Sequence, residues 1–86
     1  MFIPLTPPAQ YDHPYAGLVQ VAVVSEETLR MICGLWQPHE CARVMPEGTC
    51  LIVILAGTPP DLEAKFIVHG EAHCKGWPAD HKGGTR

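Results

Sequence analysis

Two short and almost wholly apolar runs constrain most strongly what this chain can fold into. Residues 18–24 contain Gln20 as their one polar side chain, and residues 49–56 contain only Thr49. Strands that are apolar on both faces are typical of the interior of a covered sheet. Neither run is long enough to cross a bilayer. The sequence therefore predicts two buried strands, together with other segments that cover both faces of their sheet.

A helix is expected directly after the first run. Ser25 is placed to cap its N-terminus, and Glu26 and Glu27 lie in the first turn, where the helix dipole favours acidic side chains. Pro38 is expected to end the helix. Between these points an apolar stripe recurs at helical spacing, formed by Leu29, Ile32, Cys33 and Trp36.

Residues 64–74 fit two secondary structures. As a strand, the segment would place Phe66 and the other apolar side chains on one face and His69 with its polar neighbours on the opposite face. As a helix, it would carry Gly70 in its interior, where glycine is unfavourable. We favour the strand, preceded by a short helical turn at residues 59–63.

These elements predict a small single α+β domain in β-α-β-β order, in which residues 39–48 are irregular. Residues 1–17 hold four prolines and should form an extended Pro-rich docking arm. Residues 18–75 should form the compact domain, and the glycine-containing residues 76–86 a flexible C-terminal tail. Large apolar side chains in the arm and tail are the predicted interaction residues: Phe2, Ile3, Leu5, Tyr11, Tyr15 and Trp77.

The four cysteines are expected to be reduced. They stand at positions 33, 41, 50 and 74, mostly among apolar neighbours, where a free cysteine behaves as a small core side chain. The N-terminus has no basic start, and its prolines interrupt any apolar signal segment, so we expect a cytoplasmic protein with free thiols. No Cys-x-x-Cys motif is present to suggest a zinc ribbon or a thioredoxin-like site.

One run of side chains is chemically suited to bind a metal ion, formed by His69, Glu71, His73 and Cys74, with Asp80 and His81 further along the chain. On a helix, His69 and His73 would lie about 5–6 Å apart and could share an ion. On a strand, they would lie about 13 Å apart and could not. Because we favour the strand, zinc is the alternative here, and a solvated polar face with no cofactor is the first expectation.

The composition narrows the classes of partner. Only 17% of the residues are charged and the net charge is −3, so a nucleic-acid partner is not expected, and no apolar run spans a membrane. A cysteine such as Cys41 beside His39 could in principle act as a nucleophile, but no assembled catalytic site is visible, so catalysis is not favoured.

Two strands that are apolar on both faces need other segments to cover both faces of their sheet, and the chain has too few such segments. This favours association with another protein, including a second copy of the chain. We therefore predict a small cytosolic protein-interaction module of the binding or inhibitor type, without catalytic activity and forming a homodimer. The alternative is a divalent-metal-binding protein or metal-dependent hydrolase that uses the cluster of His69, Glu71, His73 and Cys74.

Overall fold

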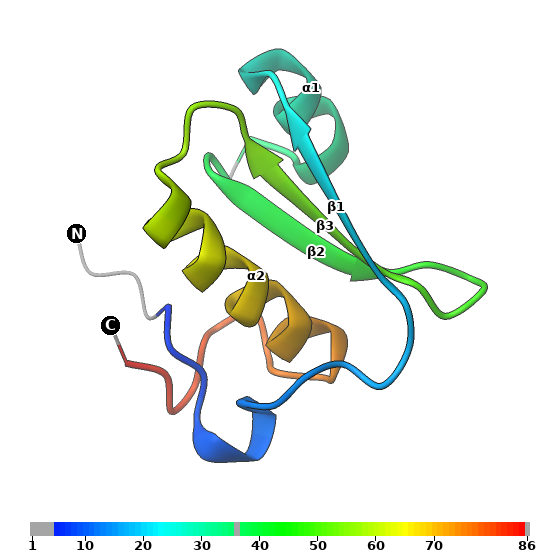
Figure 1. Ribbon diagram of the computed structural model, residues 1–86, viewed down its shortest axis with the longest axis vertical. Coiled ribbons are helices and arrows are strands. Elements are labelled where there is room, and N and C mark those ends of the chain that lie inside the picture. Colours follow the sequence, from blue (N-terminus) through cyan, green and yellow to red (C-terminus); the bar gives the residue numbers. More distant parts are fainter. Residues whose placement is uncertain (1–4, 36, 86) are drawn as a thin grey trace.

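The computed structural model of the protein describes residues 5–35 and 37–85 and contains a three-stranded sheet with two α-helices (Figure 1). A short 3-10 helix, Ala9–Tyr11, precedes these elements. They follow in the order β1 (Val19–Val24), α1 (Glu26–Cys33), β2 (Glu40–Val44), β3 (Cys50–Leu55) and α2 (Pro60–Cys74). The predicted class, a small single α+β domain, is confirmed. The element order is consistent with the predicted β-α-β-β order, but the residues differ. Strand β2 lies in a segment predicted to be irregular, and the segment predicted as the last strand belongs to helix α2.

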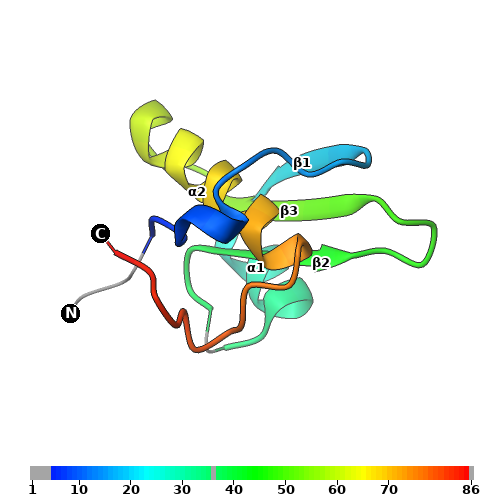
Figure 2. The same cartoon turned by 90° about the horizontal axis from the view of Figure 1, so that it is seen from below.

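Strand β3 is the centre of the sheet. It pairs in parallel with β1, where Val21 lies opposite Ile52, and antiparallel with β2, where Cys41 lies opposite Val53. The two helices lie on opposite faces of the sheet (Figure 2). Ile52 packs with Phe66 of α2, whereas Val53 packs with Leu29 of α1. The prediction that this apolar strand is covered on both faces is therefore confirmed.

Strand β1 does not have the same cover, so the prediction of a second doubly buried strand is wrong. Helix α2 packs over β2 and β3, away from β1. Leu18, directly before β1, is 78% exposed, and Val23 is 54% exposed. Strand β2 also differs from the sequence-based expectation, since residues 40–44 form an edge strand within the segment predicted to be irregular. Its polar side chains conceal the usual apolar alternation.

Residues 64–74 are helical, which corrects the preferred assignment of this segment as a strand. The helix starts at consecutive prolines and carries Asp61 and Glu63 in its first turn, as expected at a helix N-terminus. Gly70 faces the sheet at close range: a Cβ atom there would lie 2.9 Å from Ile52 Cγ1. Gly70 is thus present because α2 approaches β3 closely, and the alternation along the segment had no structural meaning.

Replacing Gly70 with alanine should therefore destabilise the protein, although alanine is the better helix former by about 1 kcal/mol. The added methyl group would press on the buried Ile52, and overpacking of this kind costs about 1–3 kcal/mol. Chemical denaturation of Gly70→Ala measures the change in the free energy of unfolding. At an exposed position of the same helix, Ala64→Gly should also destabilise, by about 1 kcal/mol, through propensity alone. A stabilised Gly70→Ala variant would contradict the close packing.

Helix α1 begins as predicted, with the Ser25 hydroxyl accepting a hydrogen bond from the Thr28 amide. It ends earlier than predicted, at Cys33, because Gly34 follows with a φ of 85° and turns the chain away before Pro38 is reached. Trp36, which the sequence placed on the apolar stripe of this helix, lies outside the described residues.

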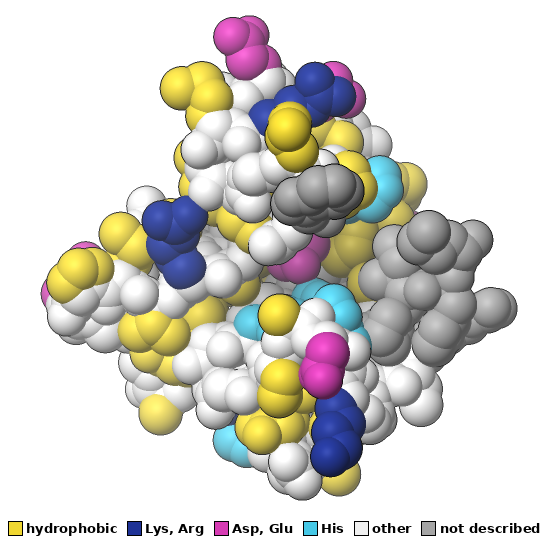
Figure 3. All heavy atoms as spheres, turned by 180° about the vertical axis from the view of Figure 1, so that it is seen from behind, with side chains coloured by type: hydrophobic (Ala, Val, Ile, Leu, Met, Phe, Trp, Pro, Cys, Tyr) yellow, Lys and Arg dark blue, Asp and Glu magenta, His cyan; other side chains and the backbone are white. Residues whose placement is uncertain are grey.

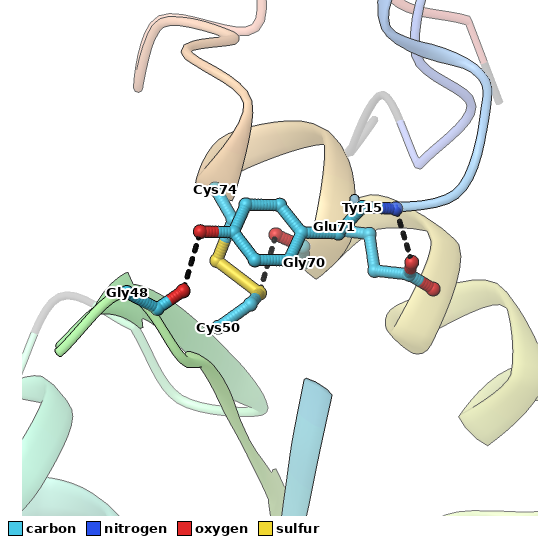
Figure 4. The surroundings of a disulfide bond; sticks show 6 residues. All are labelled: Tyr15, Gly48, Cys50, Gly70, Glu71 and Cys74. Carbon is cyan, nitrogen blue, oxygen red and sulfur yellow. Dashed lines mark hydrogen bonds between the residues drawn. A yellow bond between two sulfur atoms is a disulfide. The ribbon is translucent and has the colours of Figure 1, made fainter. Parts of the chain in front are cut away.

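All four cysteines are paired in disulfides, so the expectation of free thiols is wrong. Cys33 at the end of α1 is bonded to Cys41 of β2, and Cys50 of β3 is bonded to Cys74 at the end of α2 (Figure 4). Beside the second bond, the Tyr15 hydroxyl donates to a backbone carbonyl in the loop between β2 and β3. Because disulfides persist mainly in oxidising compartments, this pairing gives no support to the prediction of a cytoplasmic location.

The two ends of the described chain lie side by side. Thr6 and Thr85 exchange two backbone hydrogen bonds, and both Leu5 and Tyr15 of the predicted arm pack against the core on the α2 side of the sheet. Trp77, in the predicted tail, is buried with 2% of its surface exposed. Phe2 and Ile3 lie outside the described residues. Neither of the described α-helices is both long and apolar enough to cross a membrane.

Candidate metal centre

Three imidazole rings converge at the C-terminal half of α2. His69 and His73 lie one helical turn apart on the same side of α2, and His81 reaches them from the segment that follows the helix. The Nε2 atoms of His69 and His73 are 3.0 Å apart, and each lies 3.2 Å from Nε2 of His81. The three nitrogen atoms therefore form a nearly equilateral triangle.

The opposite ring nitrogens of two of these histidines contact backbone carbonyls. His69 Nδ1 lies 3.2 Å from the carbonyl oxygen of Leu5, and His73 Nδ1 lies 2.8 Å from that of Trp77. Since a carbonyl oxygen can only accept, each Nδ1 must carry the proton and donate it. The neutral rings then direct their Nε2 lone pairs into the centre of the triangle. Histidines that bind metals are held in this way by a second hydrogen bond.

Trp77 forms one wall of the cluster. Its ring stacks on His73 with 4.8 Å between centroids, and it meets His69 and His81 edge-on, at 5.1 Å from each. The indole N–H donates to the carbonyl of Lys82, which holds the ring in place. Trp77 thus shields one side of the histidines from water and strengthens electrostatic interactions inside the cluster.

His81 adopts a backbone conformation that is uncommon for a residue with a side chain. Its φ is 59°, in the left-handed region, which among described residues other than glycine occurs only here. The backbone amide of His81 donates a hydrogen bond to the carbonyl of Pro78, and this bond closes a turn after Trp77. Such conformations persist where the surrounding structure requires them. Here the turn directs the His81 ring at the other two imidazoles.

Glu40, the first residue of β2, lies beside this triangle. Its Oε1 is 3.6 Å from His69 Nε2, and its side chain is only 9% exposed. Oε2 finds no hydrogen-bond partner among the described residues. Figure 3 shows histidine side chains next to an acidic side chain in a hollowed part of the surface, between two projecting regions. A nearly buried carboxylate with an unpaired oxygen is costly unless a cation compensates it.

Burial controls the charges in the cluster. It raises the pKa of Glu40 to about 8. Burial, together with the positive charge that His73 can carry, lowers the pKa of His69 to about 4. The same two causes, again with burial as the larger, lower the pKa of His81. Although Glu40 and His69 are at ion-pair distance, burial thus favours the neutral form of both, and His69 keeps the lone pair that a metal ion requires.

The spacing of the three nitrogens suits a tetrahedral ion. Zinc binds imidazole nitrogen at about 2.0–2.1 Å, which places neighbouring ligand atoms about 3.3 Å apart. The observed separations of 3.0–3.2 Å are close to that value. Imidazole ligands suit zinc, copper, nickel and iron, whereas calcium and magnesium prefer oxygen. Such an ion could hold distant segments together or, with an open coordination position, activate water.

The structure brings together two of the four predicted metal ligands. His69 and His73 lie in the triangle, whereas Glu71 accepts a hydrogen bond from the Tyr15 amide and Cys74 is bonded to Cys50 (Figure 4). His81 and Glu40 were outside the predicted set. The signal for His81 was its place in the same histidine-rich stretch. For Glu40, which belongs to a distant strand, the sequence held no such signal.

Comparisons with protein-family models, with curated proteins and with solved structures find no significant match to this chain.

Proposed function

We propose that this protein binds one divalent transition-metal ion of the zinc class through His69, His73 and His81. The observation that supports this most strongly is the convergence of three Nε2 atoms within 3.0–3.2 Å of one another. Two of the rings are fixed by Nδ1 hydrogen bonds to carbonyls, so their metal-binding nitrogens are already oriented. We therefore prefer metal binding, which was the alternative in the sequence analysis, to the interaction module that was its leading hypothesis.

A cluster of histidines that only fills space would be arranged differently. Three basic nitrogens in mutual contact repel one another when more than one ring is protonated. When the rings are neutral, the two whose Nδ1 atoms donate to carbonyls have no proton left between their Nε2 atoms. A cation at the centre converts this repulsion into attraction. Without a metal ion only His81 can place a proton inside the triangle, and the contact between the His69 and His73 lone pairs stays unrelieved; a metal ion relieves it.

Titration calorimetry with zinc tests the proposal on the metal-free, oxidised protein. We expect about one equivalent to bind, because the triangle holds a single ion. His81→Ala should weaken zinc binding by at least about 100-fold. Loss of a metal ligand costs more affinity than loss of a residue that only hydrogen-bonds to a ligand, which typically costs about 10–100-fold. His81 is the best position to change because it lies outside the helices. His39→Ala, at an exposed histidine, should bind zinc normally. Binding below about 0.2 equivalents in the wild type would contradict the proposal.

We also propose that the chain pairs with a second copy along β1. This edge strand is uncharged, and its neighbour Leu18 and its own Val23 are largely exposed. An unprotected apolar edge is a template for strand pairing, and two identical uncharged edges suit each other across a two-fold axis. Light scattering should give about 19 kDa, twice the 9.4 kDa of the chain. Val21→Lys should give single chains, whereas Met31→Lys on α1 should not. A single-chain mass for the wild type at every concentration would refute pairing.

A further inference from the structure

We infer that Glu40 supplies the fourth ligand to the ion and closes its coordination, so that the metal holds the fold together and does not activate water for hydrolysis. This inference rests on the proposed function, because it concerns the same ion. It also decides between the two metal roles that the sequence left open, a binding protein and a hydrolase.

The position of Glu40 suits a fourth ligand. A tetrahedral ion bound to the three imidazoles directs its fourth position away from their triangle, and an oxygen there lies about 3.3–3.5 Å from each nitrogen. Oε1 of Glu40 is already 3.6 Å from Nε2 of His69. The last torsion of a glutamate side chain is soft, so a rotation of the carboxylate can move an oxygen toward the other two nitrogens. Glu40 lies outside the set of ligand atoms within 4.8 Å of one another, so the ion has to draw the carboxylate inward when it binds.

The surroundings of Glu40 also indicate a cation. Its side chain is nine-tenths buried, and Oε2 has no partner in the described part of the chain. A carboxylate in such a place is unfavourable unless it meets a positive charge. A divalent ion bound to three neutral imidazoles supplies that charge, and the carboxylate in turn neutralises half of it. The unpaired carboxylate oxygen and the convergent histidine nitrogens thus have the same explanation.

The protein groups around the ion match a structural site better than a hydrolase site. A catalytic zinc ion keeps one position open for water and substrate, whereas a structural zinc ion has four protein ligands. Trp77 covers one side of the histidines. Two pockets on the described surface, of about 390 and 170 Å³, are lined by other residues and by none of the three histidines. Neither of these two pockets therefore brings a substrate to the ion, and Glu40 occupies the position that a water molecule would need.

The closed site would join segments that are far apart in the sequence. Glu40 belongs to β2, His69 and His73 to α2, and His81 to the C-terminal segment. The N-terminal arm is added through the carbonyl of Leu5, which accepts from His69 Nδ1. One ion thus cross-links an edge strand, a helix and both ends of the described chain. This is the structural use of a metal in a small domain with a limited core.

Zinc affinity, measured by competition with a chelator, tests the fourth ligand in Glu40→Gln. We expect the zinc affinity of Glu40→Gln to be about 10–100-fold or more below that of the wild type, because the three histidines still bind the ion. The affinity of Glu40→Asp should lie between those of the wild type and Glu40→Gln. Glu47→Gln, at an exposed position in the β2–β3 loop, should match the wild type. The near-ultraviolet circular dichroism of the metal-free variants establishes that they are folded. A folded Glu40→Gln with wild-type affinity would overturn the inference, while loss of binding in His81→Ala would still support the proposed function.

A second measurement separates a ligand from a catalytic base. Zinc-loaded wild-type protein should hydrolyse p-nitrophenyl acetate no faster than the same concentration of free zinc. Hydrolysis well above that level, lost in Glu40→Gln without a change in zinc affinity, would make Glu40 a general base and overturn the closed site. Failure of zinc to bind the wild type at all would refute the proposed function itself.

Discussion

Zinc at a hundredfold excess over its dissociation constant is expected to raise the melting temperature of the metal-free protein by about 10–20 °C. A ligand that binds only the native state adds about 2.7 kcal/mol at that excess, and each kcal/mol shifts the melting temperature of a domain this small by about 4–8 °C. The effect should be specific to the folded chain because the ligands come from β2, α2 and the C-terminal segment, which are brought together only by folding.

Scanning calorimetry with and without zinc measures this shift, and EDTA should reverse it. Magnesium is the matched control, because it prefers oxygen ligands and should leave the melting temperature almost unchanged. His81→Ala provides the second control: its metal-free melting temperature can differ from that of the wild type, but zinc should no longer raise it. An equal rise in wild type and His81→Ala would contradict a site that contains this histidine.

Reducing the two disulfides is expected to unfold most of the metal-free protein. From the sequence separations of 24 and 8 residues, loop closure predicts a loss of about 3.5 kcal/mol for Cys50–Cys74 and about 2.5 kcal/mol for Cys33–Cys41. Together these are comparable to the whole stability of about 5–15 kcal/mol that single domains usually have. Denaturant titrations with and without reductant measure the change.

The paired variants rank the two bonds. Cys50→Ala with Cys74→Ala should be the more destabilised pair, because it opens the longer loop and frees α2 from β3. Cys33→Ala with Cys41→Ala should lose less. Zinc should partly restore the fold of either pair, since the proposed ion would link α2 to β2 independently of the sulfur bridges. A reduced wild-type protein with an unchanged denaturation midpoint would show that the bridges are not needed.

The local part of the fold could be predicted from the sequence because its signals are local. The apolar run at β3 and the Ser25 cap followed by Glu26 and Glu27 each lie within a few consecutive residues, and the structure contains both elements. The cover of β1 could not be predicted in this way. It depends on which strands α2 crosses, and in the structure α2 packs on β2 and β3, with Gly70 close to Ile52.

The convergence of His69 and His73 was not predicted because a single secondary-structure assignment was wrong. An alternating pattern favoured a strand at residues 64–74 and separated His69 from His73, while Gly70 counted against a helix. In the structure the glycine belongs to the helix–sheet contact, and the two histidines lie one turn apart. Glu40 and the disulfide partners were beyond sequence reasoning for another reason. Glu40 and Cys50 come close to α2, and Cys41 to the end of α1, only when the strands pair and the helices pack on the sheet.

X-ray absorption at the zinc edge of the loaded, oxidised protein tests most directly whether His69, His73 and His81 hold the ion. The proposed site predicts four nitrogen or oxygen ligands at about 2.0–2.2 Å, with the outer-shell scattering of three imidazole rings. Sulfur ligands at about 2.3 Å, or a zinc ion surrounded by oxygen without imidazole scattering, would contradict it.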